Sequence, residues 1–103
     1  MNLQHIQRKD VRHVIGLMSG TSCDGVDAAL VRIKGTGADI AIKLLSFRSF
    51  PFPHDMTMRL LASRLDAKEL CALNFELGEQ MARAASAMLD VARSEPAGVD
   101  FIA

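Results

Sequence analysis

The sequence predicts an α/β fold whose mixed sheet begins with three antiparallel strands and is followed by helices. Short apolar runs bounded by glycines occur at residues 14–18 and 26–34, and runs of this length are typical of strands. A turn-rich cluster at 34–39 leads into a third run at 40–50, so the second and third strands should pair antiparallel. From residue 66 to about residue 93, apolar residues recur at helical spacing.

The third strand contains a change of parity. Its apolar residues first alternate, and then Leu45 and Phe47 occupy the opposite set of positions. Either both faces of the sheet are partly covered, or a β-bulge shifts the register near Leu45. The strand should end at Pro51, because proline has no N–H to donate to the ladder.

A short helix is expected after the prolines, over residues 55–63. Asp55 is its candidate N-cap, because aspartate at that position accepts a hydrogen bond from the backbone of the first turn. One face of this helix is apolar, and we expect it to lie in the core rather than to bind a cofactor. The residues of that face are Met58, Leu61 and Leu65.

The longest helix should begin at Asp66, which has capping-box spacing with Glu69. The same apolar spacing fits a coiled coil, but Asn74, Gly78 and many alanines argue against one. A close neighbouring backbone would explain Gly78, and solvation or capping is the expected role of Asn74 and Glu79. The apolar stripe consists of Leu70, Leu73, Leu77, Met81, Ala84, Ala85, Met88 and Val91.

The two ends of the chain differ in character. Residues 1–13 are polar and mixed in charge, and we expect a frayed leader there. Residues 99–103, VDFIA, are apolar apart from Asp100 and look like the opening of a buried strand. We therefore expect residues 14–103 to be the front part of a larger protein.

The amino-acid composition narrows the classes of protein to which this chain could belong. Half of the 103 residues are hydrophobic, which argues against disorder, and 12 basic residues balance 12 acidic ones, which argues against nucleic-acid binding. No apolar stretch approaches the roughly 20 residues that span a bilayer, and no secretory signal is present, so we expect a cytoplasmic protein without membrane contact. Cys23 and Cys71 are too few and too far apart for a metal site or a disulfide framework.

The bend between the first two strands carries the residues best suited to chemistry. Backbone amides and hydroxyls suit a phosphate, and carboxylates suit the magnesium ion that accompanies it. Glycines permit positive φ and bring a ligand close to the backbone. The residues concerned are the glycines Gly16, Gly20 and Gly25, the hydroxyl residues Thr21 and Ser22, and the carboxylates Asp24 and Asp27.

Two better-known phosphate motifs do not fit this bend. A Walker A loop needs a lysine near its end, and no lysine lies between Lys9 and Lys34. The dinucleotide fingerprint needs glycines that open a helix, whereas a strand is expected after Asp24. On composition alone, a tight hairpin whose Ser, Thr and Asp side chains cap their own backbone is an equal alternative.

Residues 16–31 closely resemble the amino-terminal signature of the anhydro-N-acetylmuramic acid kinases; their sequence is GLMSGTSCDGVDAALV. These kinases belong to the superfamily of sugar kinases, heat-shock chaperone ATPases and actin. Two further segments are similar to the same family, namely PFP at 51–53 ahead of a helix and LNFELGE at 73–79. The resemblance covers about residues 14–103.

The resemblance implies a ribonuclease-H-like (actin-like ATPase) domain, of which residues 14–103 are the amino-terminal part, with the second domain absent. It also implies an ATP- and Mg²⁺-dependent kinase, with a tendency to form homodimers. The reaction would convert 1,6-anhydro-N-acetylmuramic acid and water to N-acetylmuramic acid 6-phosphate in peptidoglycan recycling. The implied nucleotide-binding residues are Gly20, Thr21, Ser22, Cys23, Asp24, Gly25, Val26 and Asp27.

The catalytic base, the adenine site and most of the sugar site are expected downstream of Ala103, so this chain alone should not turn over. Cys23 stands where the family commonly has leucine, and Met18 where the wider superfamily usually has aspartate. Because methionine cannot hold magnesium, Asp24 is the candidate metal residue. The alternatives are another sugar or acyl kinase of the superfamily and a non-catalytic nucleotide-binding scaffold.

Overall fold

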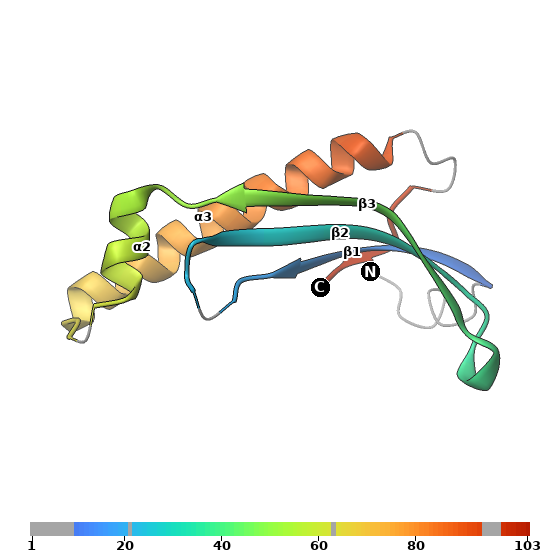
Figure 1. Cartoon of the computed structure of the whole chain (residues 1–103), viewed down its shortest axis with the longest axis horizontal. Helices are drawn as coiled ribbons and strands as arrows, with labels where there is room; N and C mark the ends of the chain where they lie inside the picture. Colours follow the sequence, from blue (N-terminus) through green and yellow to red (C-terminus); the bar gives the residue numbers. More distant parts are fainter. Residues whose placement is uncertain (1–9, 21, 63, 94–97) are drawn as a thin grey trace.

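The computed structural model contains a four-stranded mixed sheet (Figure 1). The structure describes residues 10–20, 22–62, 64–93 and 98–103. Its strands are β1 (Val11–Met18), β2 (Gly25–Lys34), β3 (Ala41–Pro51) and β4 (Phe101–Ile102). They lie in the order β3-β2-β1-β4, with β1, β2 and β3 antiparallel and β4 parallel to β1. An α/β fold that opens with three antiparallel strands is therefore confirmed.

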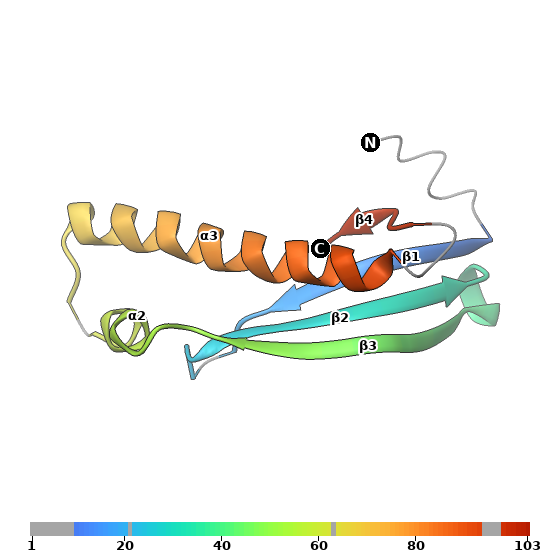
Figure 2. The same cartoon turned by 90° about the horizontal axis from the view of Figure 1, so that it is seen from above.

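The helices lie on one side of the sheet. Helix α3 (Ala67–Ala92) runs along the strands, and the shorter helix α2 (His54–Leu60) lies near one end of α3 (Figure 2). The 3-10 helix η1 (Gly37–Asp39) forms part of the turn between β2 and β3. In the described part of the chain, no element covers the opposite face of the sheet. None of the described helices is both long enough and apolar enough to cross a membrane.

Strand β1 begins at Val11, earlier than the sequence suggests. Residues 11–13, which were expected in the leader, therefore belong to the sheet. Val11 pairs with Lys34, and this pairing draws polar residues into the sheet. His13 is only 4% exposed. The backbone N–H of His13 donates to Asp100 Oδ2 at 2.9 Å, and the backbone N–H of Asp100 donates to the His13 carbonyl at 2.8 Å. Residues 1–9 of the expected leader lie outside the described residues.

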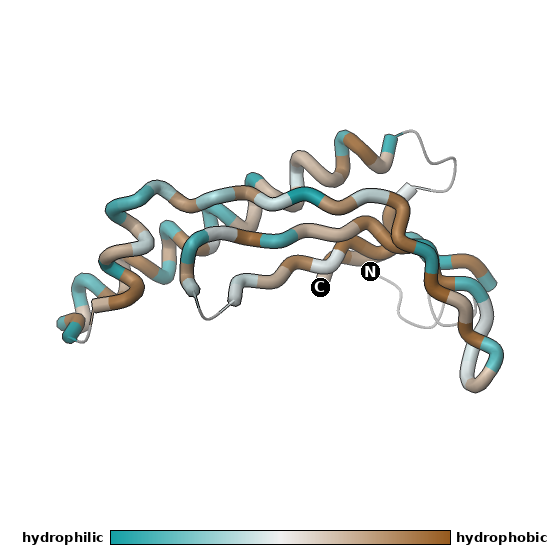
Figure 3. The backbone as a smooth tube through the Cα atoms, viewed as in Figure 1, coloured by the Kyte–Doolittle hydropathy of each residue, from teal (hydrophilic) through white to brown (hydrophobic). Residues whose placement is uncertain are grey.

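A β-bulge in β3 explains the change of parity. Leu30 pairs with Ser46 whereas Val31 pairs with Leu44, so Leu45 is the extra residue between them. The bulge turns Leu45 toward the core, where it packs against buried residues of β1, β2 and α3. Figure 3 shows hydrophobic residues gathered where the strands bend toward the β2–β3 hairpin.

The core lies between α3 and one face of β1 and β2. Because strand side chains alternate, Val26, Ala28 and Leu30 share that face and are at most 1% exposed. The core has two clusters, which Leu17 and Phe50 both contact. The first contains Ile15, Ala28, Leu30, Met88 and Ala92, and the second contains Val26, Phe52, Met56, Leu73 and Ala84.

Helix α3 begins as predicted. Asp66 is its N-cap, and the Asp66 carboxylate accepts a hydrogen bond from the Glu69 N–H at 2.8 Å. Leu70 is 58% exposed because it lies one turn before the first buried position, so the predicted stripe begins too early. The expected close neighbour of Gly78 is wrong, since a Cβ at this position would meet nothing within 4 Å. Asn74 is exposed.

The predicted apolar face of the first helix is wrong for Met58 and Leu61, whereas Leu65 packs against the second core cluster as predicted. Met58 and Leu61 are 56% and 55% exposed, and Met56 is buried instead at 2%. The helix begins at His54, directly after a Pro53 cap that makes no side-chain hydrogen bond, so Asp55 lies in the first turn rather than at the N-cap. Met56 is the buried residue of α2 because it packs in the same core cluster as Phe52.

An ion pair joins the two helices. The Arg59 guanidinium donates to both Glu76 carboxylate oxygens, at 2.7 and 3.0 Å, and to Asp55 at 3.3 Å. Hydrogen bonding to Glu76 raises the pKa of Arg59 above its ordinary value. This exposed contact adds to the buried packing of Met56 and Leu73, which lie in the same core cluster and join α2 to α3.

The burial of α3 predicts the effect of truncating its central contact. Met88→Ala should lower the free energy of unfolding by about 2–5 kcal/mol, because a buried methionine leaves a cavity when truncated. Leu89→Ala is the matched control on the solvent side, where the side chain is 41% exposed. Urea unfolding measures both variants, and equal losses would contradict the packing of α3.

Candidate functional site

The loop between β1 and β2 closes through one backbone hydrogen bond. The Cys23 N–H donates to the Gly20 carbonyl at 3.2 Å, and Cys23 has a φ of 54°. None of the loop glycines singled out by sequence adopts a left-handed φ, so the non-glycine Cys23 makes the turn. Thr21 lies outside the described residues.

Gly25 serves a close approach within the protein. A Cβ on Gly25 would lie 2.5 Å from the Phe50 carbonyl oxygen and 3.0 Å from the Pro51 Cα atom. Gly25 pairs with Pro51 at the end of β3, so the absent side chain lets the two strands meet there. The sequence analysis assigned this space to a ligand, whereas the neighbouring strand occupies it.

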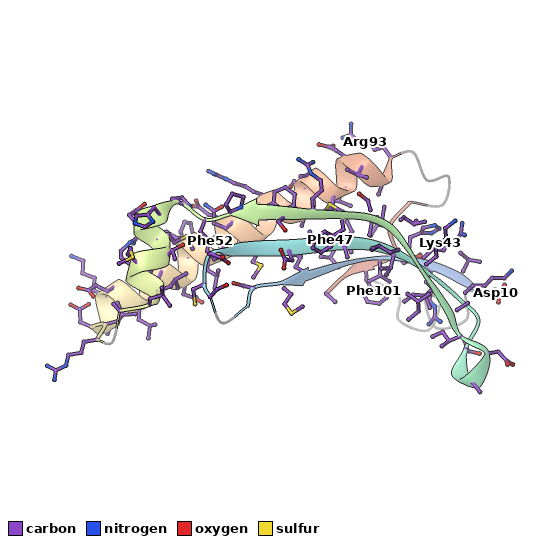
Figure 4. The ribbon with its side chains drawn as sticks, viewed as in Figure 1. Asp10, Lys43, Phe47, Phe52, Arg93 and Phe101 are labelled. Atoms are coloured by element: carbon purple, nitrogen blue, oxygen red, sulfur yellow. The ribbon has the colours of Figure 1, made fainter. Side chains whose placement is uncertain are left out.

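The carboxyl end of the loop is fastened to the core. The Phe52 N–H donates to the Asp24 carbonyl at 2.8 Å. Phe52, which is labelled in Figure 4, is 7% exposed. It belongs to the same core cluster as Val26 and Met56. The backbone of Asp24 is therefore held in place by the segment that connects β3 to α2.

Two carboxylates at this bend each accept a serine hydrogen bond. Ser22 Oγ donates to Asp24 Oδ1 at 2.8 Å, and Ser49 Oγ donates to Asp27 Oδ1 at 2.7 Å. Both aspartates are exposed. The sequence analysis missed Ser49, because its position opposite Asp27 depends on the bulge that sets the register of β3.

The carboxylates border two hollows. The first measures about 500 Å³ and is lined by Ser22, Asp24, Gly25, Val26, Asp27, Ser49, Phe50 and Pro51. The second measures about 470 Å³, lies on the open face of the sheet and is mainly apolar, with Met18, Ala29 and Phe47 in its lining. Asp27 lines both hollows.

The donors and acceptors around the first hollow suit a phosphate and a cation. In the described part of the loop, no hydrogen bond uses the N–H of Gly20 or Ser22. Val26 is 1% exposed as a whole residue and belongs to the core, so it forms the floor of the hollow rather than a donor to a ligand. Unused amides of this kind attract anions.

The carboxylates fit magnesium better than a metal held by protein alone. Among the described residues, no group of three or more His, Cys, Asp and Glu side chains is placed to hold a metal ion. Magnesium is usually bound by one or two carboxylates together with phosphates and water. Asp24 and Asp27 supply this number of carboxylates.

The fold and the loop define a mixed α/β domain whose first strand connection presents amides, hydroxyls and carboxylates. Residues 12–103 match the sequence profile of the family described as anhydro-N-acetylmuramic acid kinase. The chain therefore belongs to the anhydro-N-acetylmuramic acid kinase family, as its resemblance indicated.

Individual relatives agree with the family assignment. The chain is 38% identical to the anhydro-N-acetylmuramic acid kinase of Caldanaerobacter subterraneus subsp. tengcongensis, over 97% of this chain and 26% of that protein. It is 36% identical to the enzyme of the same name from Francisella tularensis subsp. novicida, over 91% of this chain and 26% of that protein. For the Picosynechococcus sp. kinase the identity is 46%, over 70% of this chain and 20% of that protein. The chain thus spans about a quarter of the length of the first two relatives.

The contact at Gly25 predicts opposite effects of one substitution at two glycines. Gly25→Ala should lower the free energy of unfolding by about 1–3 kcal/mol, because the new Cβ overlaps the backbone of β3. Gly78→Ala, at an open position of α3, should raise it by about 0.4–1 kcal/mol. Thermal unfolding of both variants measures the difference, and a harmless Gly25→Ala would contradict the close strand contact.

Proposed function

We propose that the full-length protein is an ATP-dependent sugar kinase that converts 1,6-anhydro-N-acetylmuramic acid and water to N-acetylmuramic acid 6-phosphate. The observation that carries this proposal is that the family match at residues 12–103 includes the bend and the start of β2, whose Ser22, Asp24 and Asp27 line the 500 Å³ hollow. Peptidoglycan recycling is the corresponding process. A cytoplasmic location and a homodimer stay predictions.

In this proposal the bend holds the terminal phosphates of ATP. The amides of Gly20 and Ser22 donate to phosphate oxygens, and the resemblance adds Thr21, whereas the Ser22 hydroxyl donates its one proton to Asp24 Oδ1. Cys23 contributes by closing the loop, since its N–H is bonded to the Gly20 carbonyl. Donors that are fixed before reaction stabilise the negative charge that shifts during phosphoryl transfer.

Asp24 is the proposed magnesium carboxylate, and Asp27 is the second. A bound magnesium ion would neutralise phosphate charge and orient the transferred group. The hydrogen bond from Phe52 to the Asp24 carbonyl fixes the backbone that carries the first carboxylate. The serine hydroxyls restrict the rotamers of both.

The proposed complete architecture is ribonuclease-H-like, with this chain as the front of its first domain. The strand order β3-β2-β1-β4, with a β4 parallel to β1, supports that proposal. In this proposal the catalytic base, the adenine site and most of the sugar site belong to the remainder of the enzyme.

Phosphorylation of the anhydro sugar by the full-length protein tests this function. Asp24→Asn should lower kcat by about 10²–10³-fold, the range seen when one preorganised electrostatic group is lost from an active site. The measurement follows the sugar 6-phosphate at saturating ATP, with Asp39→Asn, an exposed aspartate at the far hairpin, as control. Normal activity of Asp24→Asn would remove Asp24 from the metal site, and an inactive wild-type protein would contradict the kinase proposal.

A further inference from the structure

We infer that Ser49 is a positioning residue that holds the Asp27 carboxylate toward the cation accompanying the nucleotide phosphates. This inference rests on the proposed function. Ser49 lies outside the bend that resembles the kinase signature, on β3, the second strand of the β2–β3 hairpin.

The sheet itself places Ser49 beside Asp27. The two residues are direct partners in the antiparallel register of β2 and β3, and Met18 is the partner of Asp27 on the other side. Direct cross-strand partners have Cβ atoms about 4.5–5.5 Å apart, which lets short side chains meet. The 2.7 Å hydrogen bond from Ser49 Oγ to Asp27 Oδ1 uses this proximity.

Ser49 stands on a firmly held part of β3. The next residue, Phe50, packs against both core clusters, and Arg48 lies over the Phe50 ring at 5.1 Å from its centroid. By contrast, the Ser22 hydroxyl that bonds Asp24 comes from the same short loop as its acceptor. Asp27 is therefore the carboxylate that a separate, rigid element orients.

The hydrogen bond leaves one oxygen of Asp27 for a ligand. Among the described residues, Asp27 Oδ2 receives no hydrogen bond, and Asp27 borders both hollows. An exposed aspartate without a partner would sample several rotamers, and only some of them aim an oxygen at the first hollow. The Ser49 hydroxyl thus pre-organises a cation ligand without touching the cation.

Binding of Mn²⁺ in the presence of ADP tests this role without turnover. In the full-length protein, Ser49→Ala should raise the Mn²⁺ dissociation constant, measured by electron paramagnetic resonance of free Mn²⁺, by about 10–100-fold, as is typical when a residue that orients a metal ligand is lost. Ser49→Thr keeps a hydroxyl and should bind nearly as the wild type does. Ser46→Ala, on the same strand but paired with Leu30, is the matched control and should change nothing.

The outcomes separate the two proposals. Wild-type affinity in Ser49→Ala, or an equal loss in Ser49→Thr, overturns the positioning role. If Ser49→Ala unfolds, Ser49→Cys keeps the volume but weakens the donor, so it should lose affinity, and wild-type binding by this variant overturns the role. In the kinase assay, Ser49→Ala should raise the Mg²⁺ concentration for half-maximal rate more than it lowers kcat at saturation. A wild-type protein that binds no Mn²⁺ with ADP overturns the proposed function itself.

Discussion

The packing of α3 against one face of β1 and β2 is the constraint on which the other features depend. Small residues such as Ala28 and Ala84 are fully buried at this contact, which lets the helix approach the sheet closely. Since strand side chains alternate, burying Val26 and Ala28 turns Asp27 to the other face. The same hydrophobic contact that stabilises the domain thereby presents the carboxylate.

The candidate site draws on three segments, of which the bend and β2 are adjacent in sequence and β3 follows after the hairpin turn. The bend supplies amides and Asp24, β2 supplies Asp27, and β3 with its extension to α2 supplies Ser49 and the Phe52 N–H. Each of the last two reaches the bend through the pairing of β2 with β3. The loop is thus short and polar, but its geometry depends on the neighbouring strand and on the core beneath it.

Periodicity and turn chemistry were enough to predict the strands, their antiparallel pairing, the long helix and its Asp66 cap. These features are local, and so one segment of sequence contains their cause. The buried face of α2 was not predictable, because Met56 is selected by contact with Phe52 rather than by helical spacing. Ser49 was missed for a related reason. Its pairing with Asp27 depends on the register between β2 and β3, and the sequence did not show whether a bulge near Leu45 shifts that register. At Gly25 the sequence indicated a close approach to the backbone, but it predicted a ligand there, whereas the neighbour is β3.

The bulge at Leu45 divides β3 into two segments that contact different parts of the domain. Residues 46–51 align with the beginning of β2 and serve the bend, whereas residues 41–44 form the arm that ends in η1. An irregular point of this kind absorbs changes in strand pairing, because one unpaired residue already separates the two ladders. A change in the length of the distal arm can therefore be accommodated without disturbing the alignment of Ser49 with Asp27.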